Sequence, residues 1–147
     1  MVIENAINVY TDGSSFSHPR SGGIGIRLVI VDALGQEECQ DMVLPEYAGA
    51  TNNQMELKAC CITGIREAML APGFGSVGRI VVHSDSQYVL GNRDRAFFSW
   101  SRNGWRNFDG KPAENASLWK ELLKTVKAVN AFGKRVEFRW VKGHAKD

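Results

Sequence analysis

Residues 23–43 read GIGIRLVIVDALGQEECQDMV, in which two runs of strand-forming residues flank a turn at 33–35. The Ile and Val content predicts one strand at 23–31, and the run after the turn predicts a second at 37–43. Residues 6–11 (AINVYT) predict a strand ahead of them. Because the connections between these runs are short, we expect the three strands to form an antiparallel meander.

The hydrophobic period changes after Thr51, from the alternation typical of strands to the spacing typical of a helix. Thr51 and Gln54 have the spacing of a capping box, and the Pro-Gly pair at 72–73 ends the segment. The apolar positions of this predicted helix are Met55, Ala59, Ile62, Ile65 and Met69.

The second half of the chain alternates between strands and helices. Strands are predicted at 79–83 and 135–141, short helical material begins at Ser86, and a clear helix is predicted from about residue 115 to 131. The order βββ-α-β-α-β predicts an α/β fold with a five-stranded mixed sheet. Three antiparallel strands are followed by β-α-β units, with helices on both faces of the sheet.

The composition is that of one soluble globular domain, so residues 1–147 are predicted to form a single domain. The net charge is only +2, and any nucleic-acid binding must therefore rest on where the basic residues lie. Three cysteines without C-x-x-C spacing argue against a disulfide framework and against a zinc site. Since no stretch approaches the roughly 20 apolar residues of a membrane span and the N-terminus is not signal-like, we expect a cytoplasmic protein without a membrane partner.

Two carboxylates follow predicted strands. Asp12 ends the first strand and Asp85 ends the fourth. If these strands are parallel neighbours, both side chains lie at the same edge of the sheet. Each residue also has an ordinary structural explanation, because Asp before Gly is common in turns and Asp before a helix is a common N-cap.

Glu56 lies in the first turns of the first predicted helix. A solvated surface glutamate is one reading of this position. A helix that crosses the sheet would instead bring Glu56 over the edge that carries Asp12 and Asp85. Three converging carboxylates require a cation, and a ligand set of hard oxygens favours Mg²⁺ or Mn²⁺.

Four motifs occur in the order of the predicted elements. Together they resemble the type 1 ribonuclease H family over essentially the whole chain. The motifs are T-D-G-S at 11–14, T-N-N-Q-M-E-L at 51–57, S-D-S-Q-Y at 84–88 and W-V-K-G-H-A at 140–145.

The resemblance implies the ribonuclease H-like fold and an endoribonuclease that hydrolyses the RNA strand of RNA–DNA hybrids, leaving 5′-phosphate and 3′-hydroxyl ends. It implies cleavage with two Mg²⁺ ions, for which Mn²⁺ can substitute. Asp12, Glu56 and Asp85 match three of the family's catalytic carboxylates and metal ligands. His144 matches its mobile histidine, which moves a proton or assists product release, although an exposed loop histidine without a role is the alternative.

The same resemblance assigns contacts with the hybrid. Asn53 and Gln87 are expected to read the RNA 2′-hydroxyl, because amides both donate and accept hydrogen bonds. Thr51 is expected to contact a DNA-strand phosphate. The full predicted set is Gly13, Ser14, Thr51, Asn52, Asn53, Gln87, Trp100 and Arg102.

The segment 93–111 carries five basic and two acidic residues with interleaved aromatics. Its W-S-R-N-G-W motif resembles the family's basic protrusion, which grips the DNA strand. Trp100 and Arg102 are the predicted contacts, whereas Trp105 and Trp119 are predicted to lie in the core.

The chain departs from the family pattern after His144, because it lacks the usual final helix and fourth carboxylate. Asp147 is a candidate replacement ligand, and a terminal residue without a role is the alternative. We therefore expect reduced, metal-sensitive activity that favours Mn²⁺.

Three other functions remain open: another nuclease of the same fold, a weak or inactive hybrid-binding module, and the ribonuclease H domain of a reverse transcriptase. In each case the expected partner is nucleic acid. We expect a monomer with no small-molecule cofactor.

Overall fold

The computed structural model describes residues 2–11, 23–45, 51–107 and 109–141. The strands are β1 (Ala6–Thr11), β2 (Gly23–Val31), β3 (Glu37–Pro45), β4 (Arg79–Ser84) and β5 (Arg135–Trp140). The helical segments are α1 (Asn52–Met55), η2 (Glu56–Thr63), α2 (Gly64–Leu70), η3 (Phe74–Ser76), α3 (Gln87–Phe98), η4 (Trp100–Arg102) and α4 (Ala116–Asn130).

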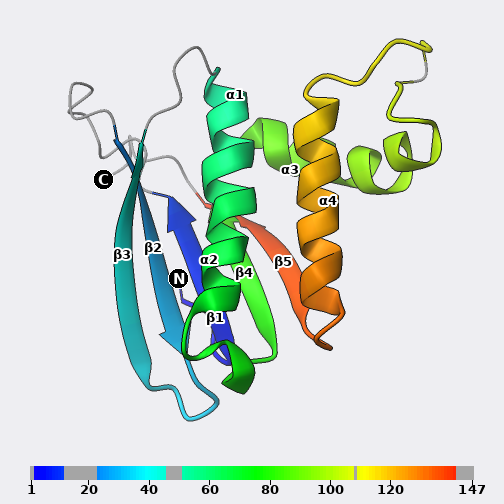
Figure 1. Ribbon diagram of the computed structural model, residues 1–147. Coiled ribbons are helices and arrows are strands. Elements are labelled where there is room, and N and C mark those ends of the chain that lie inside the picture. The colour runs from blue at the N-terminus through cyan, green and yellow to red at the C-terminus, as the bar shows by residue number, and fades with distance from the viewer. Residues whose placement is uncertain (1, 12–22, 46–50, 108, 142–147) are drawn as a thin grey trace.

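The five strands form one mixed sheet in the order β3-β2-β1-β4-β5 (Figure 1). The first three strands pair antiparallel, and β1, β4 and β5 run parallel. This confirms the predicted sheet. The predicted bounds of β1 and β2 are also confirmed, whereas β3 extends to Pro45, β4 extends to Ser84 and β5 ends at Trp140.

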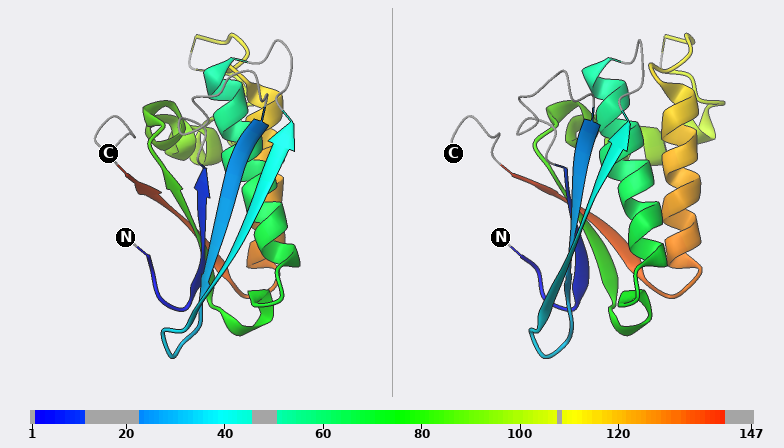
Figure 2. Two further views of the ribbon diagram at one scale, coloured as in Figure 1. Left: turned by 90° about the vertical axis from the view of Figure 1, so that its left-hand side faces the viewer. Right: turned by 60° about the vertical axis from the view of Figure 1, so that its left-hand side comes forward.

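The core lies between one face of the sheet and the helices. Alternate strand residues such as Ile7, Val9 and Val82 are fully buried there, because successive side chains of a strand point to opposite faces. The helices add Ile65 and Trp119 to the same cluster. Figures 1 and 2 show α2 and α4 running side by side across this face.

Every helix given above that contributes to the core packs against this same face of the sheet. The other face carries the polar positions of β1, β2 and β4, which are Asn8, Arg27 and His83. The sequence predicted helices on both faces of the sheet. Within the described part of the chain, no helix forms a layer on this second face (Figure 2). The described helices also include none long and apolar enough to cross a lipid bilayer.

The segment 52–70 is one helical run whose middle, η2, is a π-helix. Its start confirms the predicted capping box. Thr51 N–H donates to Gln54 Oε1 at 3.0 Å, and Gln54 N–H donates to Thr51 Oγ1 at 3.1 Å. The widened turns were not predicted, because the apolar spacing of this segment also fits an ordinary α-helix. A π segment is rare and is frequent at functional sites, and this one begins at Glu56.

Candidate functional site

The ends of β1 and β4 lie beside each other, because the two strands are parallel neighbours with Tyr10 opposite His83. Thr11 is the last residue of β1, and Ser84 is the last residue of β4. Asp85 therefore begins the connection that leaves this end of the sheet. The predicted site residues Asp12, Gly13, Ser14, His144 and Asp147 lie outside the described residues.

Glu56 reaches the end of β4 through a hydrogen bond. Ser84 Oγ donates to Glu56 Oε2 at 3.2 Å and accepts the Ser86 backbone N–H at 3.0 Å. Ser84 is only 1% exposed, so its hydroxyl joins the helix to the strand end away from bulk water. The structure thus brings Glu56 next to the residue that precedes Asp85, as the crossing of helix and sheet predicted.

The connection from β4 to α3 leaves Asp85 available for another role. Ser86 is the N-cap of α3, and its side chain accepts the Val89 N–H at 3.1 Å. The N-cap explanation of Asp85 is therefore wrong, because the neighbouring serine fills that position. Asp85 is exposed at the strand end.

The residues predicted to read the hybrid lie on the starts of two helices. Thr51 and Gln87 are exposed, and Asn53 is partly exposed. Asn52 begins α1, but its side chain lies outside the described part of the structure. Thr51, Asn53 and Gln87 flank the contact between Glu56 and the end of β4 in the sequence and present polar side chains to solvent.

A polar junction that was not predicted connects α1, α3 and α4. Gln54 Nε2 donates to Asn115 Oδ1 at 3.2 Å, and Asn115 Nδ2 donates to the Tyr88 hydroxyl at 3.0 Å. Trp119 Nε1 also donates to that hydroxyl, at 3.1 Å. Asn115 precedes α4, adopts φ 58° and makes no side-chain cap. The junction holds together the helices that carry Glu56 and Gln87.

A second cross-link lies behind the strand ends, on the face of the sheet opposite the helices. The rings of Tyr10 and His83 stack with centroids 4.4 Å apart, and His83 Nε2 lies 2.8 Å from Asn8 Oδ1. Asn8 Oδ1 also accepts the Ile3 N–H, while Asn8 Nδ2 donates to the carbonyls of Ile3 and Val29. Because these bonds fix the orientation of the Asn8 amide, His83 Nε2 must donate to Asn8 Oδ1.

Burial stabilises the neutral form of this histidine. It lowers the pKa of His83 to about 4, and the positive charge of Arg139 acts in the same direction. His83 is 4% exposed. His83 therefore stays neutral at physiological pH, and its side chain links β4 to Tyr10 and Asn8 of β1.

The basic segment 93–111 departs from the prediction at one tryptophan. Trp100 is 8% exposed and packs edge-to-face on Trp119, with ring centroids 6.3 Å apart. The 3-10 turn η4 directs the Trp100 ring into the core, so the ring offers little surface for the predicted DNA contact, which stays a prediction. Trp105 is partly exposed instead, and Lys120 Nζ lies 6.0 Å from its ring centroid. Arg102 is exposed, as its predicted phosphate contact requires.

The donor set at the strand ends suits a hard divalent cation. Glu56 and Asp85 supply carboxylate oxygens, the ligands that Mg²⁺ and Mn²⁺ favour. Among the residues that the structure describes, no three Asp, Glu, His or Cys side chains form a cluster that could hold a metal. The predicted three-carboxylate set includes Asp12, so it is not tested by the described residues.

Comparison with known proteins gives consistent results. A family model described as RNase H matches residues 4–147. Ribonuclease H of Novosphingobium aromaticivorans is 35% identical over 142 residues, covering 94% of this chain and 84% of the relative. Ribonuclease H of Haemophilus influenzae (strain 86-028NP) is 31% identical over 145 residues, covering 97% of this chain and 81% of the relative.

Solved structures show the same fold. The PFV RNase H domain in solution superposes with a TM-score of 0.61 at 19% identity, covering 97% of this chain and 81% of that domain. A foamy viral protease-reverse transcriptase in complex with RNA/DNA hybrid gives a TM-score of 0.60 at 14% identity, covering 99% of this chain and 19% of that polypeptide.

Proposed function

This chain belongs to the ribonuclease H family, and from that premise we propose that it is an endoribonuclease that hydrolyses the RNA strand of RNA–DNA hybrids. The observation that carries the proposal is the hydrogen bond from Ser84 to Glu56, which joins the helix to the end of β4 directly before Asp85. Glu56 is thereby tied to the strand residue that directly precedes Asp85, at the edge where the parallel strands end. That edge is the usual location of reactive groups in such sheets.

The proposed metal ligands are Asp12, Glu56 and Asp85. Asp12 follows Thr11, the last residue of β1, and β1 is the parallel neighbour of β4. This chain continuity supports its inclusion. Two Mg²⁺ ions, with Mn²⁺ as a substitute, would supply an activated water and neutralise the charge that develops on the leaving oxygen. The three carboxylates would hold the ions against the scissile phosphate, and the products would carry 5′-phosphate and 3′-hydroxyl ends.

The chain after β5 supplies the two remaining proposed groups. His144 would move a proton or assist product release, since an unperturbed histidine titrates near neutral pH. Asp147 would add a carboxylate to the metal site. The proposal takes the protein as a cytoplasmic monomer that needs no small-molecule cofactor.

Recognition of the hybrid is proposed for polar residues beside the acidic edge. Asn53 and Gln87 would read the 2′-hydroxyl of the RNA strand, the group that separates RNA from DNA. Arg102 would contact a phosphate of the DNA strand. The remaining proposed contacts are Gly13, Ser14, Thr51 and Asn52.

Cleavage of end-labelled substrates tests the proposal. Wild-type protein should cut the RNA of a hybrid in Mg²⁺ or Mn²⁺ and leave double-stranded DNA intact. Asp12→Asn should reduce the rate well beyond the roughly 10- to 100-fold that loss of a secondary metal-site contact costs. The matched control is Asp94→Asn, which removes a carboxylate that is 81% exposed in the basic segment and should leave the rate unchanged.

Two outcomes would contradict the proposal. Hybrid binding without cleavage in either metal would identify a binding module. Cleavage of double-stranded DNA at the rate of the hybrid would indicate a different nuclease of this fold.

A further inference from the structure

The charges of this protein are separated along the chain. Residues 93–127 contain eight basic and four acidic residues, a net charge of +4. The remaining ten basic and twelve acidic residues leave the rest of the chain at −2. The excess of positive charge therefore extends past the basic segment 93–111 and includes α4.

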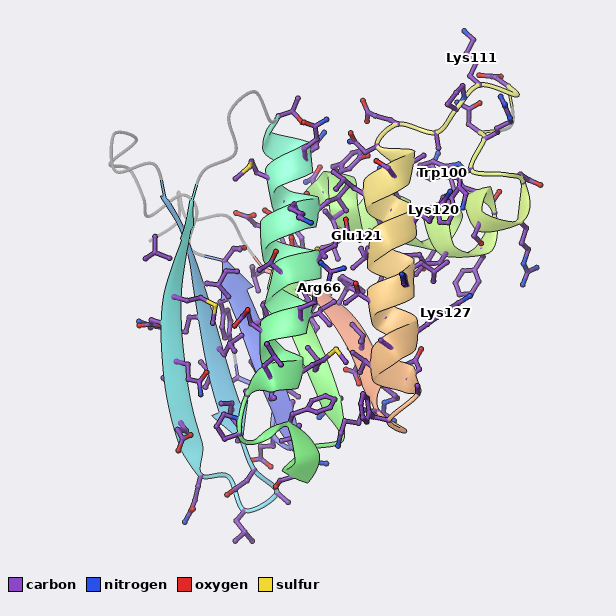
Figure 3. All side chains as sticks on the ribbon, viewed as in Figure 1. Arg66, Trp100, Lys111, Lys120, Glu121 and Lys127 are labelled. Carbon is purple, nitrogen blue, oxygen red and sulfur yellow. The ribbon has the colours of Figure 1, made fainter. Side chains whose placement is uncertain are left out.

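The solvent face of α4 carries three lysines and no acid. Lys120, Lys124 and Lys127 are exposed and follow one another at i, i+4 and i+7. Glu121, the single acidic residue of this helix, points instead toward η2 and α2, where its carboxylate pairs with Lys58 of η2 at 3.2 Å and with Arg66 of α2 at 3.0 Å. Figure 3 shows Lys120 and Lys127 on the side of α4 away from Arg66.

This arrangement disfavours the isolated helix. Like charges at i and i+4 repel each other, and Lys120 and Lys124 have that spacing. A bound polyanion would remove this cost.

The three lysines continue the basic segment in space. Lys120 Nζ lies 6.0 Å from the ring centroid of Trp105, whose backbone N–H donates to the Trp100 carbonyl. At 1.5 Å per residue, Lys120 and Lys127 are about 10 Å apart along the helix axis, the length of about three base pairs. The spacing therefore suits two or three consecutive phosphates.

We propose that Lys120, Lys124 and Lys127, here named the α4 lysine track, bind the phosphate backbone of the nucleic acid beyond the section that is cut. This inference rests on the proposed function and extends its substrate contact. Nucleic acid fits the track better than an anionic membrane does. A membrane-binding helix inserts its apolar face, whereas the apolar residues Trp119 and Leu122 of α4 are fully buried in the core.

The test compares two triple variants of equal charge. The track variant is Lys120→Ala, Lys124→Ala, Lys127→Ala, since alanine preserves the helix. The control removes three other exposed cations from different elements, as Arg27→Gln, Arg66→Gln, Arg135→Gln. Equal thermal unfolding of the two variants shows that both are folded. Binding is measured without divalent metal, so that cleavage does not intervene.

The readout is the salt dependence of binding to hybrids of about 8 and about 24 base pairs, roughly 27 and 80 Å long at 3.4 Å per pair. Each phosphate contact contributes about 0.9 to the slope of log K against log salt. On the long hybrid, the magnitude of the slope of log K against log salt should therefore be smaller by about 2 to 3 for the track variant than for wild type. On the short hybrid, the slopes of the two proteins should be nearly equal. Between about 50 and 200 mM salt, wild type should lose up to about 40-fold more affinity than the track variant. The control variant should keep the wild-type slope.

Equal slopes for the track and control variants on the long hybrid would overturn the inference. The inference would also fail if the track variant lost binding to phosphatidylserine vesicles while its slope on the hybrid stayed unchanged. That result would assign the track to a membrane. The proposed function fails separately. If wild type cleaves no hybrid but its salt slope on a long duplex still depends on the three lysines, phosphate binding by the α4 lysine track is supported and the proposed ribonuclease activity is contradicted.

Discussion

At the scale of single residues, Ser84 decides how the acidic edge is assembled. Its hydroxyl is buried, donates to Glu56 and accepts the Ser86 N–H, so both its donor and an acceptor site are used. A hydrogen bond to a charged group contributes about 1.5 to 3 kcal/mol. Ser84 therefore fixes the direction of a carboxylate that the proposal assigns to metal binding.

Replacing Ser84 should weaken metal binding without unfolding the protein. We expect Ser84→Ala to raise the Mg²⁺ concentration for half-maximal cleavage by about 10-fold or more, as loss of that hydrogen bond implies. Calorimetric titration with Mg²⁺ gives a readout that does not depend on turnover. Ser84→Thr restores the hydroxyl and should recover most of the affinity. Ser101→Ala is the control, because Ser101 Oγ of η4 donates to the Phe97 carbonyl at the end of α3, away from Glu56 and Asp85 in the sequence. An unchanged Mg²⁺ requirement in Ser84→Ala would contradict this role.

The buried His83 predicts how stability depends on pH. Its pKa is about 4 in the folded protein and 6.5 as the ordinary value, so the unfolded chain binds a proton over this interval and the folded protein does not. Stability is therefore fully present above pH 6.5 and is lost as the pH falls toward about 4, by at most about 3 kcal/mol. Urea unfolding between pH 7.5 and 4.5, without divalent metal, measures this loss. His83→Gln keeps a donor for Asn8 and should flatten the profile, whereas an unaltered slope would show that other groups dominate.

Residue identity alone suggested part of the proposed site. Glu56 and Asp85 could be selected because carboxylates at a strand end and on a crossing helix suggest a metal. Ser84 could not, since a serine before a carboxylate has no distinctive pattern until the helix is placed against it. Trp100 was assigned to the surface because aromatic residues among arginines suggest stacking on bases. Its burial depends on the direction of η4, which the sequence pattern does not contain.

At the scale of elements, the Tyr88 hydroxyl connects three helices. It accepts from Asn115 Nδ2 and Trp119 Nε1 and donates to the Glu114 carbonyl at 3.3 Å. Asn115 in turn accepts from Gln54 of α1. The starts of α1, α3 and α4 are thus held relative to one another by one set of hydrogen bonds.

Removing that hydroxyl should loosen the junction. Tyr88→Phe leaves two donors without their acceptor, so we expect a loss of about 1 to 3 kcal/mol in the free energy of unfolding. Urea denaturation of Tyr88→Phe, Asn115→Ala and the double variant measures the coupling. If the junction acts as a unit, the double variant should lose clearly less than the sum of the single losses. Strict additivity would show that the bonds are independent.

The elements were predicted more fully than their connections. The strands β1 and β2 and the Thr51–Gln54 capping box follow from local patterns, and the structure confirms them. The π-helical turns of η2 do not follow, because the apolar spacing is nearly the same for an α-helix. Asn115 shows the same limit, since the tertiary contact with Tyr88 takes the side chain that local propensity assigns to capping.

At the scale of the whole molecule, the net charge of +2 is the sum of a positive part of the chain, residues 93–127, and a remainder that is negative. The acidic residues Glu37 and Glu38 are exposed on β3, an edge strand of the sheet. The basic segment and α4 lie at the other end of the molecule, as Figure 1 shows. Composition could establish only that the total charge is small. The separation of the two regions depends on the strand order and on the side of the sheet that α4 covers.

This separation predicts that the location of charge, and not its total, controls association with the hybrid. At about 0.15 M salt the Debye length is about 8 Å, so the distant acids on β3 are screened from a duplex held at the basic side. Glu37→Gln with Glu38→Gln should then change the association rate constant by less than about 2-fold, although the net charge rises by two. Arg102→Gln with Arg106→Gln should lower it by about 10-fold, because both arginines are exposed in the basic segment that we propose faces the duplex. At about 0.01 M salt, where the Debye length is about 30 Å, the β3 variant should associate measurably faster than wild type. Stopped-flow association at both salt concentrations measures these rates. Equal and opposite effects of the two double variants on the association rate constant at about 0.15 M salt would mean that the total charge governs association.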